Sequence, residues 1–155
     1  MKVSRRGLYA LKALSHLAGA YDRGLVKIHD IAELESIPVK FLEGILVTLK
    51  NGRLVSSQRG REGGYRLRRP PAEIMLGDVV RLMDGPLAPL GDAAELAQRV
   101  RTEERHAGLF AILLDVRNAA AAILDHTTLA DLLERNRRVQ GARGRGRGTG
   151  PAGPR

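Results

Sequence analysis

The feature that most constrains the fold of this chain is a glycine-rich and arginine-rich segment, RGREGG (59–64). The segments on either side of it, RLVSSQ (53–58) and YRLRR (65–69), alternate in the manner of short β-strands. A phosphate-binding glycine loop is instead followed by a helix, whose N-terminal N–H groups face the anion. Because a strand-like segment ending in two prolines follows here, we interpret 59–64 as a hairpin tip. Its glycines permit positive φ angles, and its arginines are expected to be exposed.

Two short amphipathic segments precede this hairpin. IHDIAELE (28–35) and PVKFLEGILVTLK (38–50) repeat apolar residues at helical spacing, and Ser36 and Ile37 form the turn between them. Two ordinary helices of a bundle would show the same periodicity. A helix-turn-helix that is followed by a hairpin, however, is a winged helix. The outer side of the second helix presents Val39, Lys40, Glu43, Gly44, Val47 and Lys50.

The remaining helices are predicted from periodicity and capping residues. A first helix, capped by Ser4, should bury the side chains of Leu8, Leu11, Leu14, Leu17 and Ala18. The helix at 28–35 should bury those of Ile28, Ile31, Ala32 and Leu34. The glycine of Asn51-Gly52 should stop the helix at 38–50. A fourth helix (72–85) should bury Ile74, Val79, Leu82 and Met83. Further helices are expected at 92–106, where Asp92 and Glu95 suggest a capping box, at 107–124, and after Thr127-Thr128.

The expected fold class is mainly α with a small β-hairpin, a winged helix-turn-helix domain joined to a long C-terminal helix, which the family resemblance given below makes a dimerisation helix. We assign residues 1–85 to the winged domain and 86–106 to a linker and connecting helix. Residues 107–136 form the long helix and a short final helix, and 137–155 form a disordered basic Arg/Gly tail.

Charge is distributed unevenly along the chain. Residues 1–70 carry 14 Lys/Arg against 6 Asp/Glu, 71–134 carry 5 against 11, and 135–155 carry 7 against none. A basic first half and a basic tail are typical of a polyanion binder, and double-stranded DNA is the expected partner. The acidic middle contains the apolar segment 107–124, with charged and polar residues near its centre, so we expect a buried or interface helix and no membrane span. No signal peptide is recognised, and a cytoplasmic protein is expected.

Several classes of site are excluded or unsupported. The chain has no cysteine, which rules out disulfides and thiolate-bound zinc or iron–sulfur centres. Its four histidines form no spaced ligand set, and no nucleophile is paired with a base. We therefore expect neither an enzyme, nor a metal, nor a cofactor.

The segments MKVSRRGLYALKAL, IHDIAE, FLEGIL, LVSSQRGREGGYRL and IMLGDVV, in this order, resemble the Rrf-two family of bacterial winged-helix transcription regulators. The resemblance runs from Met1 to about Leu90 and more loosely from Leu109 through LADLL (129–133). It implies a homodimer whose long helices pair and whose recognition helices enter successive major grooves of a pseudo-palindromic operator. The implied interface residues are Leu109, Ile112, Leu113, Val116, Ala120 and Ile123. Packing of this helix within its own chain is the alternative.

Well-known members of that family bind an iron–sulfur cluster through cysteines located before the dimer helix. Asp92 lies about where the first of these would fall, and Leu8 is apolar where some relatives supply a carboxylate. We therefore expect no cluster. DNA binding would then be regulated in another way: by a small-molecule effector in the cleft between the winged domain and the dimer helix, by a partner protein, or by the abundance of the regulator alone.

The DNA contacts are expected from Arg5, Arg6, Val39, Lys40, Glu43, Gly44, Lys50, Arg53, Arg59, Arg61 and Arg66. By the resemblance, Glu43 is the recognition-helix glutamate, and a carboxylate there accepts a hydrogen bond from cytosine N4. Arg59 and Arg61 should insert into a narrow minor groove, while the other cations contact phosphates. An ordinary surface glutamate and solvated hairpin arginines are the alternatives.

The sequence thus predicts a dimeric, sequence-specific transcription regulator, and we expect a repressor. A winged-helix adaptor that binds protein and a non-specific DNA-binding protein are the rival interpretations. The Arg/Gly tail is either a DNA hook or a solvating extension.

Overall fold

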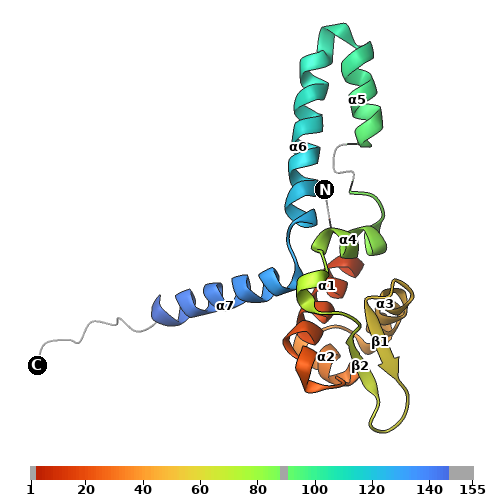
Figure 1. Ribbon diagram of the computed structural model, residues 1–155, viewed down its shortest axis with the longest axis vertical. Coiled ribbons are helices and arrows are strands. Elements are labelled where there is room, and N and C mark those ends of the chain that lie inside the picture. The colour runs from red at the N-terminus through yellow and green to blue at the C-terminus, as the bar shows by residue number, and fades with distance from the viewer. Residues whose placement is uncertain (1–2, 88–90, 147–155) are drawn as a thin grey trace, which may run out of the picture.

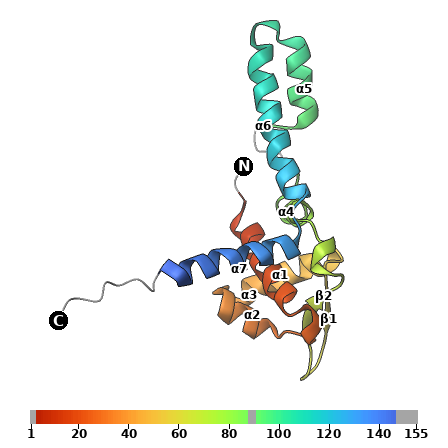
Figure 2. The same ribbon diagram turned by 60° about the vertical axis from the view of Figure 1, so that its left-hand side comes forward.

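The computed structural model of the 155-residue chain describes residues 3–87 and 91–146. A folded body carries a long hairpin of two helices, α5 and α6, and the last helix, α7, crosses the body and projects sideways (Figures 1 and 2). In chain order the elements are α1 (Arg5–Gly19), η1 (Tyr21–Arg23), α2 (Ile28–Glu35), α3 (Val39–Asn51), β1 (Val55–Gln58), β2 (Gly64–Leu67), η2 (Pro71–Glu73), α4 (Leu76–Asp84), α5 (Ala93–Thr102), η3 (Glu104–His106), α6 (Ala107–Asp125) and α7 (Leu129–Gly146).

The winged helix is present, and the predicted fold class is confirmed. Strands β1 and β2 pair antiparallel from Val55↔Leu67 to Gln58↔Gly64, with residues 59–63 as the tip of the wing. Gly60 has a positive φ of 109°. A Cβ on Gly64 would lie 2.6 Å from the carbonyl oxygen of Val26, so this position needs glycine for the close approach of another strand-like residue.

That residue, Val26, forms an isolated antiparallel β-bridge with Tyr65, which the sequence analysis did not predict. Its N–H donates to the carbonyl of Tyr65 at 2.8 Å, and it accepts from the Tyr65 N–H at the same distance. The bridge fixes the segment before α2 against β2, close to the tip of the wing.

The main apolar core joins the helices of the body to the β-hairpin of the wing. Its fully buried large side chains are Leu14, Leu17, Ile31, Leu42, Ile45, Leu46, Leu49, Val55, Ile74, Val79 and Leu129. Two predicted core residues are wrong, because Leu8 is 51% exposed and Leu34 is 70% exposed. Helix α1 buries a stripe of small residues and leucines that does not reach Leu8, and the short α2 buries only Ile31 and Ala32.

The helix ends agree with the predicted caps in most places. Ser4 accepts from the N–H of Gly7 at 2.9 Å, and Asp92 accepts from the N–H groups of Ala94 and Glu95 at 2.8 and 3.3 Å. The Thr128 hydroxyl and the Asp131 carboxylate cap the start of α7 reciprocally.

Gly52 follows the end of α3 as predicted, but the left-handed residue is Arg53, with φ 58°. A Cβ on Gly52 would lie 2.4 Å from a methyl group of Leu82, so the glycine is required by the close approach of α4 rather than by its own φ.

Three predicted helix boundaries differ from the structure. Helix α5 ends at Thr102 and not at residue 106, and the 3₁₀ turn η3 (Glu104–His106) follows it. Helix α4 begins at Leu76 and not at residue 72, because Pro71 starts a single 3₁₀ turn and Met75 pairs with Thr128 as an isolated bridge. Helix α7 continues to Gly146, ten residues past the predicted end at 136. Glu134 pairs with Arg137 and Arg138 along this extension, which supports the helix through contacts one turn apart. The remainder of the predicted tail, 147–155, lies outside the described residues.

Helix α6 is attached to the body at its C-terminal end. Arg81 of α4 donates to both carboxylate oxygens of Asp125, at 2.6 and 2.8 Å. A Cβ on Gly77 would lie 2.1 Å from the Asp125 carboxylate, so this glycine allows the two helices to meet. The hydrogen bonds from Arg81 are the main cause of a lowered pKa at Asp125.

Candidate nucleic-acid interface

Helix α3 has one buried side and one exposed side. Leu42, Ile45, Leu46 and Leu49 face the core, whereas Lys40, Glu43, Gly44 and Val47 are exposed on the other side. This arrangement agrees with the predicted outer face of a recognition helix.

Val39 differs from the other predicted contacts on α3. It is half-buried and packs against the core, so it is a poor candidate for contact with a base. Val47, on the same side of α3 as Glu43 and Gly44, is 57% exposed but is missing from the list of predicted contacts.

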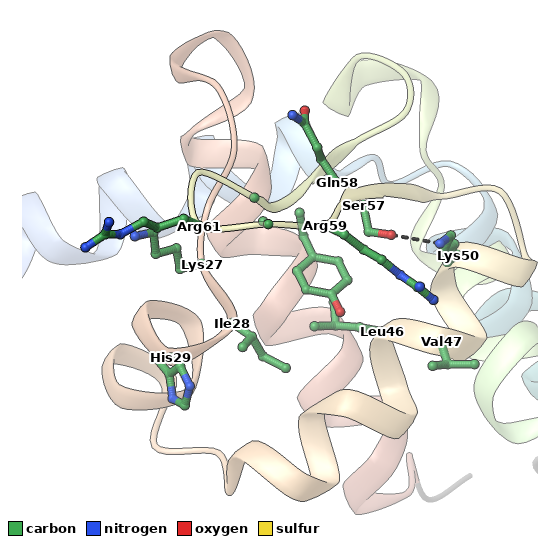
Figure 3. Close-up of a pocket in the computed structure, with 14 residues that line it drawn as sticks. Lys27, Ile28, His29, Leu46, Val47, Lys50, Ser57, Gln58, Arg59 and Arg61 are labelled. Carbon is green, nitrogen blue, oxygen red and sulfur yellow. Dashed lines mark hydrogen bonds between the residues drawn. The ribbon is translucent and has the colours of Figure 1, made fainter.

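A groove of about 510 Å³ separates the exposed side of α3 from the wing (Figure 3). Lys50, at the end of α3, donates to the hydroxyl of Ser57 on β1 at 2.8 Å and closes one end of the groove. Lys27 and His29, at the start of α2, also line it, and the sequence analysis missed both. The Val26–Tyr65 bridge brings them there, and no local sequence pattern announces such a bridge.

The two wing arginines line this groove but point in different directions. In Figure 3 the side chain of Arg59 runs back over the groove toward the part of α3 that carries Lys50 and Val47, whereas Arg61 points away from α3. The prediction treated the two as one pair. In the structure, the side chain of Arg61 points away from the groove, whereas that of Arg59 lies between the wing and α3.

The other predicted cations lie around this surface at unequal distances. Arg6 of α1 donates to the hydroxyl of Thr48 and so lies beside the exposed side of α3. Arg5 and Arg53 are exposed, near the start of α1 and in the turn before β1. Arg66 lies on the opposite face of the hairpin, in a separate hollow lined by Tyr21, Asp22, Ser56, Leu67 and Arg68. The structure therefore does not bring Arg66 together with the groove.

The groove cations are not neutralised within the described part of the chain. The ion pairs found there join His16 with Glu35 and Arg81 with Asp78 and Asp125. The others lie within α5 or at its end, and within α7. None involves a lysine or arginine of the groove. Their positive charge is available to an anion from outside.

Helix α6 carries a second exposed surface, which is apolar. Leu109, Ile112, Val116 and Ile123 repeat at helical spacing and are 51–67% exposed, and Leu113 and Ala120 beside them are half-buried. One residue of the whole helix, Ala121, is buried. Helix α5 covers only one side of α6, so the predicted interface residues form a stripe without a partner in the described chain.

The residues present do not fit an iron–sulfur cluster. No cysteine is available, and the Asp92 carboxylate already accepts from two backbone N–H groups at the start of α5. Leu8 is an exposed apolar side chain. Over residues 3–87 and 91–146, no group of three histidine or acidic side chains is placed to hold a metal ion.

Comparisons with known proteins agree with this geometry. The chain is 41% identical over 136 residues to the HTH-type protein Rv1287 of Mycobacterium tuberculosis, spanning 85% of this chain and 81% of the relative. It is 33% identical over 132 residues to the transcriptional regulator CymR of Bacillus subtilis, spanning 85% and 89%.

Solved structures give the same result. The structure of CymR, the global cysteine regulator of B. subtilis, superposes with a TM-score of 0.73 at 31% identity, covering 87% of this chain and 98% of that one. IscR of T. potens gives 0.69 at 30% identity, covering 90% and 91%. The family model Rrf2, described as an iron-dependent transcriptional regulator, matches residues 3–135. The resemblance noted from the sequence is confirmed: this chain belongs to the Rrf2 family of transcriptional regulators.

Proposed function

We propose that this regulator is a sequence-specific repressor that binds a pseudo-palindromic operator as a homodimer, with α3 in the major groove and the wing at the adjacent minor groove. The observation that carries the proposal is the unneutralised groove between α3 and the wing, bordered by cations from α2, α3 and the wing. A positively charged groove beside an exposed helix suits DNA: the helix can enter the major groove of the duplex, and the cations can contact the sugar-phosphate backbone next to it.

Each part of the surface has a distinct role in this proposal. Glu43 accepts a hydrogen bond from cytosine N4, and its charge repels phosphates, so it selects sequence at the expense of affinity. Lys27, Lys50 and Arg59 face the groove and contact phosphates. Arg61, pointing away from α3, is the arginine that reaches a narrow minor groove.

The start of α2 adds a phosphate contact. No side chain caps this helix at Lys27, so its first backbone N–H groups are available to an anion. Lys27, Ile28 and His29 at this helix start line the groove. The ammonium of Lys27 would assist the same contact.

The apolar stripe on α6 supports the homodimer. Residues Glu104–Asp125 have the length and composition of a membrane span, and only 6% of that window is buried within the chain. Asp115, Arg117 and Asn118 near its centre argue against a span and for a protein interface. A second copy of α6 would remove the exposed leucine, isoleucine and valine side chains from water, at roughly 1 kcal/mol or more for each. A homodimer that works on DNA in the cytoplasm accounts for both surfaces of the chain.

The signal is proposed to be something other than a cluster. The family description names iron, whereas the side chains of this chain do not fit an iron–sulfur centre. Neither of the two hollows described above lies in the cleft between wing domain and dimer helix, so an effector at that place stays a prediction.

The test is a set of competition titrations on an operator selected from random DNA. Glu43→Ala should keep or increase the affinity while relaxing base preference at one position per half-site. Arg61→Ala should weaken binding by about 1–3 kcal/mol, because Arg61 is assigned to the minor groove of the DNA. Arg59→Ala should weaken binding to all sequences alike and reduce the salt dependence, because Arg59 is assigned to a phosphate. An unchanged preferred sequence in Glu43→Ala would refute the assignment of α3.

A winged-helix adaptor for proteins is the second candidate. The same titrations separate the two, because DNA affinity that falls steeply as salt rises is expected of the repressor alone.

A further inference from the structure

Val47 is a branched apolar side chain in the middle of a charged, exposed surface. It lies on the outer side of α3, one turn after Glu43 and one turn before Lys50–Asn51, and 57% of it is exposed. Valine is a weaker helix former than alanine or the straight-chain residues, because its χ1 angle is restricted in a helix. Neither helix formation nor core packing therefore explains a valine at this position.

The surroundings of Val47 indicate what it could contact. It lines the groove together with Lys50 and Arg59, whose charges favour an anionic occupant (Figure 3). Gly44, one turn earlier, has no atom within 4 Å of the place where its Cβ would stand, so the helix surface between Glu43 and Val47 is open. An occupant that is anionic overall and offers a small apolar group at this point matches DNA with a thymine, because the thymine 5-methyl group lies in the major groove.

We infer that Val47 contacts the 5-methyl group of a thymine and so specifies thymine at one position of each half-site. This inference rests on the proposed function. Glu43 and Val47 are four residues apart, which is about 6 Å along a helix, and base pairs are stacked at about 3.4 Å. The thymine therefore lies one or two base pairs from the position that Glu43 reads.

The test removes the methyl group from the DNA and the side chain from the protein, separately and together. Each thymine of the selected operator is replaced by uracil, which lacks only the 5-methyl group, and binding of the full chain is measured by fluorescence anisotropy. A single uracil in one half-site should weaken binding by about fourfold, the effect of returning one apolar carbon to water, and one uracil in each half-site should weaken it by roughly sixteenfold. In Val47→Ala the thymine operator should bind more weakly and the same uracil should have no further effect.

Two control variants make the result specific. Val47→Thr retains one γ-methyl group and should keep part of the uracil effect. Leu34→Ala removes another exposed apolar side chain, 70% exposed on α2 and not among the groove residues, and should keep the whole effect.

The failure of the inference and that of the proposed function are distinguishable. A wild-type protein that binds its operator equally with thymine and with uracil at every position would overturn the inference alone, as would a uracil effect that persists in Val47→Ala. A protein for which no operator can be selected would overturn the proposed function, and the inference with it.

Discussion

Gly44→Ala should raise the stability of the fold and lower its affinity for DNA. Gly44 lies in the interior of α3, and apart from its two chain neighbours and the nearby backbone of the same helix no atom lies within 4 Å of the site of an added Cβ. The methyl group therefore meets no obstacle in the protein. Glycine in an exposed helix interior is about 0.8–1.0 kcal/mol less favourable than alanine, so the free energy of unfolding should rise by about 1 kcal/mol. For a chain of this size that corresponds to a Tm increase of about 2–4 °C.

The opposite effect on DNA follows from the position of Gly44 between Glu43 and Val47. If the backbone of α3 approaches the base edges here, the added methyl group must push the helix away, and the contacts of its neighbours lengthen together. We expect a loss of about tenfold in operator affinity, which corresponds to ~1.4 kcal/mol. Differential scanning calorimetry measures the first effect and fluorescence anisotropy the second.

Gly141→Ala provides the matched control. Gly141 is another glycine within a helix with open space around its Cβ, and it lies on α7 away from the groove. It should leave operator affinity unchanged. A stabilised Gly44→Ala protein that binds its operator as well as the wild type would refute the close approach, and an unaltered or lower Tm would refute the reasoning from helix propensity.

Other surfaces give further predictions. Val116→Glu puts a charge in the apolar stripe of α6, which is 51% exposed at this residue, and should shift the dimer to monomer in analytical ultracentrifugation, whereas an unchanged dimer would exclude the stripe as the interface. Asp125→Asn removes a carboxylate whose pKa is lowered chiefly by the hydrogen bonds from Arg81. Because the pKa is lowered in the folded state, the difference in unfolding free energy between wild type and variant should be fully present at pH 7, begin to decrease near the unfolded pKa of about 3.9, and vanish only below the lowered pKa of the folded state. The pair is about one-third exposed, so a difference of about 1 kcal/mol or less is expected, and equal differences at pH 3 and pH 7 would contradict this account. Removal of residues 141–155 takes away four arginines and should flatten the salt dependence of non-specific DNA binding without dissociating the dimer, whereas an unchanged slope would show that the tail makes no phosphate contact. Anaerobic reconstitution with iron and sulfide should give a colourless protein with unaltered operator affinity, and stoichiometric iron with a change of affinity would refute the absence of a cluster.

Features set by neighbouring residues could be predicted from the sequence. The wing follows from two alternating segments around a glycine-rich tip, and the helix starts at Ser4, Asp92 and Thr128 follow from side chains that accept from nearby N–H groups. The exposed side of α3 follows from the spacing of its leucines and isoleucines.

Features set by residues distant in the sequence were missed. Leu34 has helical spacing from Ile31 but is 70% exposed, while Ile37 after it is buried, so the packing of the short α2 leaves Leu34 on the solvent side. The late start of α4 depends on pairing between Met75 and Thr128, more than fifty positions away. The divergence of Arg59 and Arg61 depends on the path of the loop between the strands, which composition does not specify.

The burial of Leu129 has a consequence for how the protein is made. This leucine is fully buried among residues of the N-terminal body, and its N–H donates to the carbonyl of Ile74 at 3.0 Å. Deleting a buried leucine side chain usually destabilises a domain by about 2–5 kcal/mol. During translation the ribosome releases Leu129 only after it has released all of α6. The body therefore completes its core only in a chain that already carries its apolar helix, and a prematurely terminated chain that lacks Leu129 should be less stable.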